Sequence, residues 1–171
     1  MANQPPPQTR QVGFSLPLPY RLFFLVLEPI SALGGAYLAH FQQHDYLVLT
    51  HAASAPALAS VPTGTSIALS QLANLYMLFA LNEALVLRST SDLRVWKTLL
   101  FVLLVADLGH LYTLRALGSS IYLPWNFAKW NAIDWGSIPF VYLGAAMRTA
   151  FLANVGIKGA GKKPSAAGKK K

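Results

Sequence analysis

The sequence predicts an all-α fold, a transmembrane four-helix bundle with both termini in the cytosol. Four apolar stretches, each about 20 residues long, run roughly over residues 18–41, 66–87, 97–117 and 134–155. Because a helix rises about 1.5 Å per residue, about 20 apolar residues cross the hydrocarbon core of a bilayer. The composition agrees, since 54% of the residues are hydrophobic and only 12% are charged, whereas about a quarter are charged in a soluble domain.

The charges between these stretches predict the orientation. Basic residues gather beside both termini and in the second connection: Arg10, Arg21, Arg88, Arg94, Lys97 and Lys158. The first connection, residues 42–65, contains neither Lys nor Arg. The positive-inside rule therefore assigns both termini and the second connection to the cytosol. An even number of spans requires the same arrangement.

One membrane domain, residues 17–156, takes up nearly the whole chain and leaves no room for a soluble catalytic domain. Residues 1–16 include three consecutive prolines, and residues 157–171 mix Gly, Ala, Pro and Lys, so we predict two disordered tails. Six of the 14 basic residues lie in the C-terminal tail. The net charge of +8 therefore favours attraction to the lipid bilayer over nucleic-acid binding.

Charged side chains interrupt the apolar stretches in the cytosolic half of the predicted bundle. They are Arg21, Glu28, Glu83 and Arg148. A charged residue at the centre of a span costs about 2.5–3.5 kcal/mol on insertion scales, so such groups normally face the bundle interior. We predict that Glu28 or Glu83 pairs with Arg148, Arg21 or both, which would fix the helix register.

A second polar group lies deeper in the membrane. Asp107 is near the middle of the third stretch, and His110 follows three residues later on the same helical face. A buried carboxylic acid beside an imidazole is suited to general acid–base chemistry on a lipophilic substrate. Alternatively, Asp107 only orients His110, and both residues satisfy neighbouring helices.

Amide side chains follow one face of the second stretch. Gln71, Asn74, Leu78 and Asn82 are spaced by three, four and four residues, so they share a helical face. We expect this face to point into the bundle, where the amides would orient a ligand. Asp134 and Trp135, at the luminal end of the fourth stretch, are further candidates for ligand contact.

The sequence predicts no metal site and no cofactor. The histidines, His40, His44, His51 and His110, form no compact metal-binding signature, and the chain has no cysteine. It also lacks a glycine-rich phosphate loop and a Gly-x-Ser-x-Gly nucleophile elbow. One further backbone feature is Pro29, which directly follows Glu28 and should kink the first helix and free a carbonyl there.

Motifs spread from Leu18 to Gly156 carry a family resemblance. They include Leu27-Glu28-Pro29, Asn82-Glu83-Ala84, Asp107-Leu108-Gly109-His110, Asn131-Ala132-Ile133-Asp134-Trp135-Gly136 and Gly144-Ala145-Ala146-Met147-Arg148. The chain resembles a fungal family of small four-span membrane proteins that is catalogued as a domain of unknown function. The resemblance implies a fungal source and a multi-pass membrane location. Because some relatives accompany secondary-metabolite gene sets, it also makes a hydrolase or cyclase role plausible.

A looser architectural likeness is to EXPERA-type proteins, the four-span class that includes sterol isomerases and sigma-2-type receptors. Those proteins also place acidic residues in a compact bundle around an apolar ligand. The likeness is an analogy of architecture and does not fix a function.

We therefore predict a membrane protein, in the endoplasmic reticulum or another internal membrane, with an intramembrane polar site for a lipophilic small molecule. The expected chemistry is isomerisation, cyclisation or epoxide opening. Asp107 would be the acid or base and His110 its partner, with Glu28 and Glu83 as further catalytic candidates. The alternative is a non-catalytic scaffold or a lipid- or sterol-binding protein, whose polar residues only hold helices together. The sequence leaves the choice and the oligomeric state open.

Overall fold

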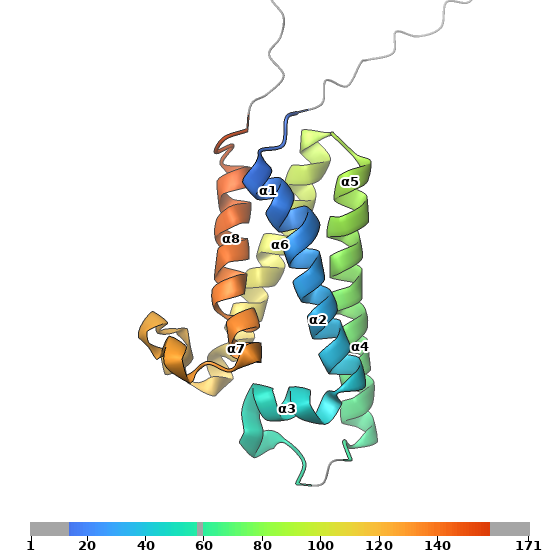
Figure 1. Cartoon of the computed structure of the whole chain (residues 1–171), viewed down its shortest axis with the longest axis vertical. Coiled ribbons are helices and arrows are strands. Elements are labelled where there is room, and N and C mark those ends of the chain that lie inside the picture. Colours follow the sequence, from blue (N-terminus) through green and yellow to red (C-terminus); the bar gives the residue numbers. More distant parts are fainter. Residues whose placement is uncertain (1–13, 58–59, 158–171) are drawn as a thin grey trace, which may run out of the picture.

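The computed structural model describes residues 14–57 and 60–157, and in that part of the chain the regular elements are all helices, joined by turns and loops. The tails predicted at residues 1–16 and 157–171 therefore lie largely outside the described residues. Figure 1 shows long helices side by side, with a short helix, α3, crossing one end. The helices are α1 (Leu18–Leu22), α2 (Glu28–Phe41), α3 (Gln43–His51), α4 (Thr63–Leu81), α5 (Leu87–Ser89), α6 (Leu93–Thr113), α7 (Ala132–Ser137) and α8 (Pro139–Leu152).

Two short π-helical segments join some of these helices into longer ones. Phe23–Leu27 links α1 to α2, and Asn82–Val86 links α4 to α5. Together with α6 and its 3-10 extension, the chain forms three helices that are long and apolar enough to cross a membrane: Leu18–Phe41, Thr63–Ser89 and Leu93–Leu117. They correspond to the first three predicted spans.

The fourth predicted stretch is not one continuous helix. It consists of α7 with six residues and α8 with 14, separated at Ile138. Pro139 follows directly, and a proline disfavours the helical conformation in the residue before it. Ile138 accordingly has φ −115° and ψ −77°, away from ideal helical values. Only α7 and α8 together approach the length of a membrane span.

Pro29 explains the π-helical segment in the first long helix. A proline inside a helix lacks an N–H, and its ring clashes with the carbonyl four residues earlier, which here belongs to Leu25. That carbonyl accepts a hydrogen bond of 2.6 Å from Nη2 of Arg88. The freed carbonyl that the sequence predicts is therefore that of Leu25, and its hydrogen bond with Arg88 joins the first long helix to the second.

Both described ends of the chain lie at the same end of the bundle (Figure 1), and aromatic side chains pack together in this region. The buried rings of Tyr20, Phe24, Trp96 and Phe151 belong to one apolar cluster. Phe14 packs edge-on against Trp96 and Phe151, with ring centroids 5.7 and 5.9 Å away. Phe14, which lies inside the predicted N-terminal tail, is thus packed against the bundle.

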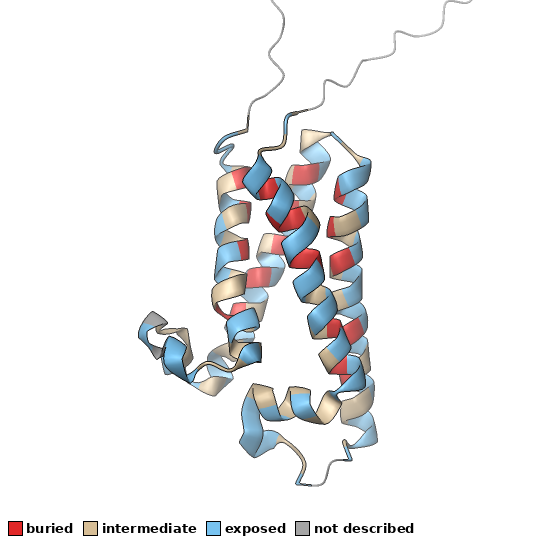
Figure 2. Ribbon diagram, in the orientation of Figure 1, coloured by how far each residue is buried: buried red, intermediate tan, exposed pale blue. Residues whose placement is uncertain are grey.

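Helices α2 and α4 pack closely through small residues. Ala36, Ala39 and Ala73 are buried between them, and a Cβ on Gly35 would touch the Tyr76 ring at 3.4 Å. Figure 2 shows that buried residues follow the inward faces of the long helices, while their outward faces are exposed. This exposed apolar surface suits a lipid environment.

Candidate functional site

Four segments each deliver one charged residue to the interior of the bundle. Glu28 begins α2, Glu83 lies in the π-helical segment Asn82–Val86, Asp107 is on α6 and Arg148 is on α8. All four residues are buried, and Arg148 and Glu83 have no exposed surface. We call these four residues the Arg148 cluster.

The Arg148 guanidinium contacts all three carboxyl groups. Its Nη1 donates to Oδ2 of Asp107 at 2.7 Å. Its Nη2 donates to Oε1 of Glu28 at 2.7 Å and to Oε1 of Glu83 at 3.1 Å. One side chain on α8 therefore links the other three long helices at a single point.

A glycine and two aromatic rings shape the space around this guanidinium. A Cβ on Gly144 would lie 2.7 Å from Nη1 of Arg148 and 3.2 Å from Oε1 of Glu28. The rings of Phe24 and Phe79 lie with their centroids 5.7 and 5.5 Å from the guanidinium carbon, within the range of cation–π attraction. Only a residue without a side chain fits at position 144 without moving the ion pairs.

The Arg148 cluster contains more acid than base. If its three carboxyl groups were all ionised, it would carry a net charge of −2 away from water, which is strongly unfavourable. Charge balance therefore requires protons on the surplus carboxyl groups. Oε2 of Glu28, Oε2 of Glu83 and Nε of Arg148 are also buried without a hydrogen-bond partner.

The sequence predicted that Glu28 or Glu83 pairs with Arg148, Arg21 or both, and in the structure both glutamates contact Arg148. Arg21, the other expected partner, is exposed and lies outside the cluster. Asp107 belongs to this cluster and not to a separate pair with His110. Residues three apart in a helix point about 60° away from each other, so Asp107 can face Arg148 while His110 faces a different part of the bundle.

His110 lines a cavity of about 200 Å³ between α3, α4, α6 and α7. The wall combines hydroxyl, imidazole and carboxyl groups with apolar side chains: Tyr46, Thr50, Leu72, Tyr76, His110, Thr113, Leu114, Leu117, Ile133, Asp134 and Ser137. The backbone of Ser137 on α7 lies close to the His110 ring. Its Nε2 is buried and has no partner. We call this space the His110 cavity.

Two tyrosines add hydroxyl groups to the His110 cavity. Oη of Tyr46 on α3 lies 3.2 Å from Oη of Tyr76 on α4. Burial, and secondarily the neighbouring Tyr76, raise the pKa of Tyr46 above its ordinary value, so this phenol remains protonated and able to donate a hydrogen bond. Sequence reasoning missed Tyr46 because its helix lies in the connection between the first two spans.

Asp134 and Trp135 have different surroundings from each other. Asp134 lines the His110 cavity, but its Oδ2 accepts a hydrogen bond from the backbone N–H of Asn131 at 3.0 Å. The Asn131 side chain in turn accepts from the N–H groups of Ile133 and Asp134, which completes a capping box at the start of α7. Trp135 is 49% exposed. Asp134 thus stabilises a helix terminus and is only partly available to a ligand.

The predicted inward direction of the amide face is wrong. Gln71 and Asn74 are exposed on the outside of α4, because the face that packs inward is formed by Leu69, Ala73 and Ala80. Asn82 is half-buried, and its Nδ2 donates to the Leu78 carbonyl in its own helix at 2.9 Å. The spacing identified a shared face correctly but not where that face points.

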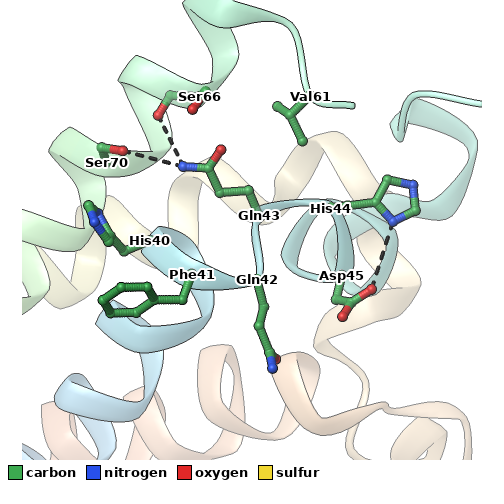
Figure 3. Close-up of a pocket in the computed structure, with 9 residues that line it drawn as sticks. All are labelled: His40, Phe41, Gln42, Gln43, His44, Asp45, Val61, Ser66 and Ser70. Carbon is green, nitrogen blue, oxygen red and sulfur yellow. Dashed lines mark hydrogen bonds and ion pairs between the residues drawn. The ribbon is translucent and has the colours of Figure 1, made fainter. Parts of the chain in front are cut away.

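A second, more open pocket of about 610 Å³ lies where α2 meets α3 (Figure 3). Nε2 of Gln43 reaches the Ser66 carbonyl and Oγ of Ser70, both at 3.3 Å, and Nδ1 of His44 lies 3.7 Å from Oδ1 of Asp45. These polar groups are largely engaged with one another, so the pocket is a weaker candidate. Among residues 14–57 and 60–157, no group of three or more His, Asp or Glu side chains is arranged to hold a metal ion.

A family model described as "Domain of unknown function (DUF7704)" matches residues 13–158. The match covers most of the chain, which therefore belongs to this family. No curated protein and no solved structure matches the chain.

Proposed function

We propose that this DUF7704 protein is a multi-pass membrane protein that binds a lipophilic small molecule in the His110 cavity and acts on it by proton transfer. One observation carries the proposal: His110 lines the cavity, and its Nε2 is buried without a hydrogen-bond partner. A buried imidazole nitrogen without a partner is unfavourable. A ligand that donates a hydrogen to this nitrogen, or accepts one from it, would remove the penalty.

The size and lining of the cavity suggest which part of a ligand enters it. Drug-sized ligands usually occupy about 300–1,000 Å³, so a cavity of about 200 Å³ suits the polar end of an amphiphile. Leu72, Leu114 and Leu117 would contact the adjoining apolar part. The hydroxyl groups of Tyr46 and Tyr76 could hold a ligand oxygen.

The chemistry follows from these groups. A neutral histidine that carries its hydrogen on Nδ1 has its lone pair on Nε2. His110 could then take a proton from the ligand while Tyr46 or Tyr76 stabilises charge on the ligand oxygen. Isomerisation or cyclisation needs no co-reactant, since the removed proton is returned to the product. Epoxide hydrolysis would also consume a water molecule.

In this proposal Glu28, Glu83 and Asp107 stabilise the bundle and do not contact the ligand. Their hydrogen bonds go to Arg148, which has no exposed surface. The same observation favours a second candidate function, a non-catalytic membrane scaffold whose polar residues only join helices. The two functions differ in what they expect of His110.

The test compares His110→Gln with His51→Gln in a strain that lacks the gene. His51 is exposed at the end of α3 and lines neither pocket, so its replacement is the matched control. Lipid-soluble extracts are compared by mass spectrometry, together with the protein level. We expect His51→Gln to restore the wild-type profile and His110→Gln to lower the product by roughly 10²-fold. A normal profile with His110→Gln at normal abundance would overturn the proposal and favour the scaffold.

A further inference from the structure

The outward face of α4 differs from an ordinary lipid-facing surface. Two carboxamides, Gln71 and Asn74, are exposed there among exposed apolar side chains, namely Ile67, Leu75 and Leu78. We call these five residues the α4 amide face. By contrast, the exposed residues Val102, Val105 and Leu108 on α6 are all apolar and need no partner other than lipid.

Both amides lie well inside the span. The helix from Thr63 to Ser89 has 27 residues and is therefore about 40 Å long. Asn74 lies about 16 Å from the Thr63 end, near the middle of the hydrocarbon core. Neither lipid tails nor water could satisfy its amide at that depth.

Neither exposed amide is satisfied within the chain. Among the other described amides, Gln43, Asn82 and Asn131 form side-chain hydrogen bonds, whereas the exposed Gln42 and Asn154, at the ends of helices α2 and α8, form none. Within residues 14–57 and 60–157, the side chains of Gln71 and Asn74 form none. Because an amide without a hydrogen bond is unfavourable in hydrocarbon, some partner in the plane of the membrane has to supply the bonds.

We propose that the α4 amide face is a self-association surface, against which the same face of a second copy packs in the bilayer. A carboxamide both donates and accepts hydrogen bonds, so each amide can pair with the amide of an identical helix. A two-fold contact brings identical patches together. The face carries no charge, so it needs no oppositely charged partner, and polar side chains are known to join helices within membranes.

The absence of cysteine allows a direct test in native membranes. Leu78→Cys places one thiol on the α4 amide face and leaves both amides intact. Val105→Cys on α6 is the matched control, because the two side chains are 56% and 54% exposed. After mild oxidation, we expect Leu78→Cys to give a disulfide-linked product of twice 18.6 kDa and Val105→Cys to remain largely monomeric.

A second set of variants tests the role of the amides. Adding Gln71→Leu and Asn74→Leu to Leu78→Cys should lower the yield of the linked dimer roughly tenfold. These replacements lie on the exposed side of α4, so the protein should remain folded, which size-exclusion chromatography in detergent checks.

Three results would overturn the proposal. They are equal linkage at positions 78 and 105, linkage that does not depend on the amides, and a linked product whose mass is not twice that of the chain. The last result would indicate a different membrane protein as the partner. None of these outcomes depends on the His110 cavity having a ligand.

Discussion

Arg148 is the only cation in contact with three buried carboxyl groups among the described residues. Arg148→Gln would leave all three without a cation and should lower the free energy of unfolding by about 3–5 kcal/mol. Glu83→Gln removes one of the surplus carboxyl groups and keeps an oxygen to accept from Arg148, so we expect a change of only about 1 kcal/mol. Thermal unfolding in detergent measures both. Equal losses for the two variants would contradict this account of the charges.

Gly144 gives a second test at the same place. In Gly144→Ala the new methyl group would lie 2.7 Å from Nη1 of Arg148, so the ion pairs have to shift, and such overpacking costs about 1–3 kcal/mol. In the control, Gly109→Ala, the methyl group meets no atom within 4 Å. Since alanine is a better helix former than glycine, Gly109→Ala should be neutral or stabilise by up to about 1 kcal/mol. If Gly144→Ala and Gly109→Ala unfold at the same temperature, the close approach of Arg148 to Gly144 does not restrict the residue at position 144.

Part of the site can be predicted at the scale of residues, and part cannot. The pairing of the glutamates with Arg148 can be predicted from the positions of these residues along their helices. Opposite charges buried at the same depth in the bundle stabilise one another. The partner of Asp107 depends on the rotation of α6 about its axis, which hydropathy does not report. The Tyr46–Tyr76 pair joins a residue in a connection to a residue in a span, and no local pattern indicates it.

Among the elements, the sequence predicted correctly the three helices that are long and apolar enough to cross a membrane. The short helix α3 was missed, because residues 42–65 were treated only as a connection. The break at Ile138 was also missed, although Pro139 is a local signal for it. On α4, the spacing correctly placed Gln71 and Asn74 on one helical face. Spacing alone does not show whether such a polar face points into the bundle or outward to a partner.

The Leu25 carbonyl accepts a hydrogen bond from Arg88, and we attribute its availability to Pro29, which has no N–H to occupy it. Arg88→Ala should therefore lower the free energy of unfolding by about 1 kcal/mol in the wild type. In Pro29→Ala the restored backbone N–H can take the Leu25 carbonyl, so Arg88→Ala should then have little effect. Unfolding of the wild type, both single variants and the double variant gives the coupling energy. Strictly additive effects would show that the arginine and the proline act independently.

At the scale of the whole molecule, the described ends of the chain lie together. Oη of Tyr20 donates to the Val155 carbonyl at 3.0 Å, and a Cβ on Gly156 would lie 3.8 Å from Pro17. Helix α3 crosses the opposite end of the bundle (Figure 1). This arrangement agrees with the predicted fourth span, which α7 and α8 would form together.

The number of spans decides the side of the C-terminus. With four spans, both termini lie on one side and the first connection on the other, whereas three spans would put the termini on opposite sides. We expect reporter tags at residue 1 and after Lys171 to be cytosolic, because the basic residues flank the termini. A tag between Ala53 and Thr63 should be luminal, since that connection contains no Lys or Arg. Protease protection of the tags in sealed microsomes measures this. A protected C-terminal tag with an accessible N-terminal tag would show that α7 and α8 do not cross the bilayer.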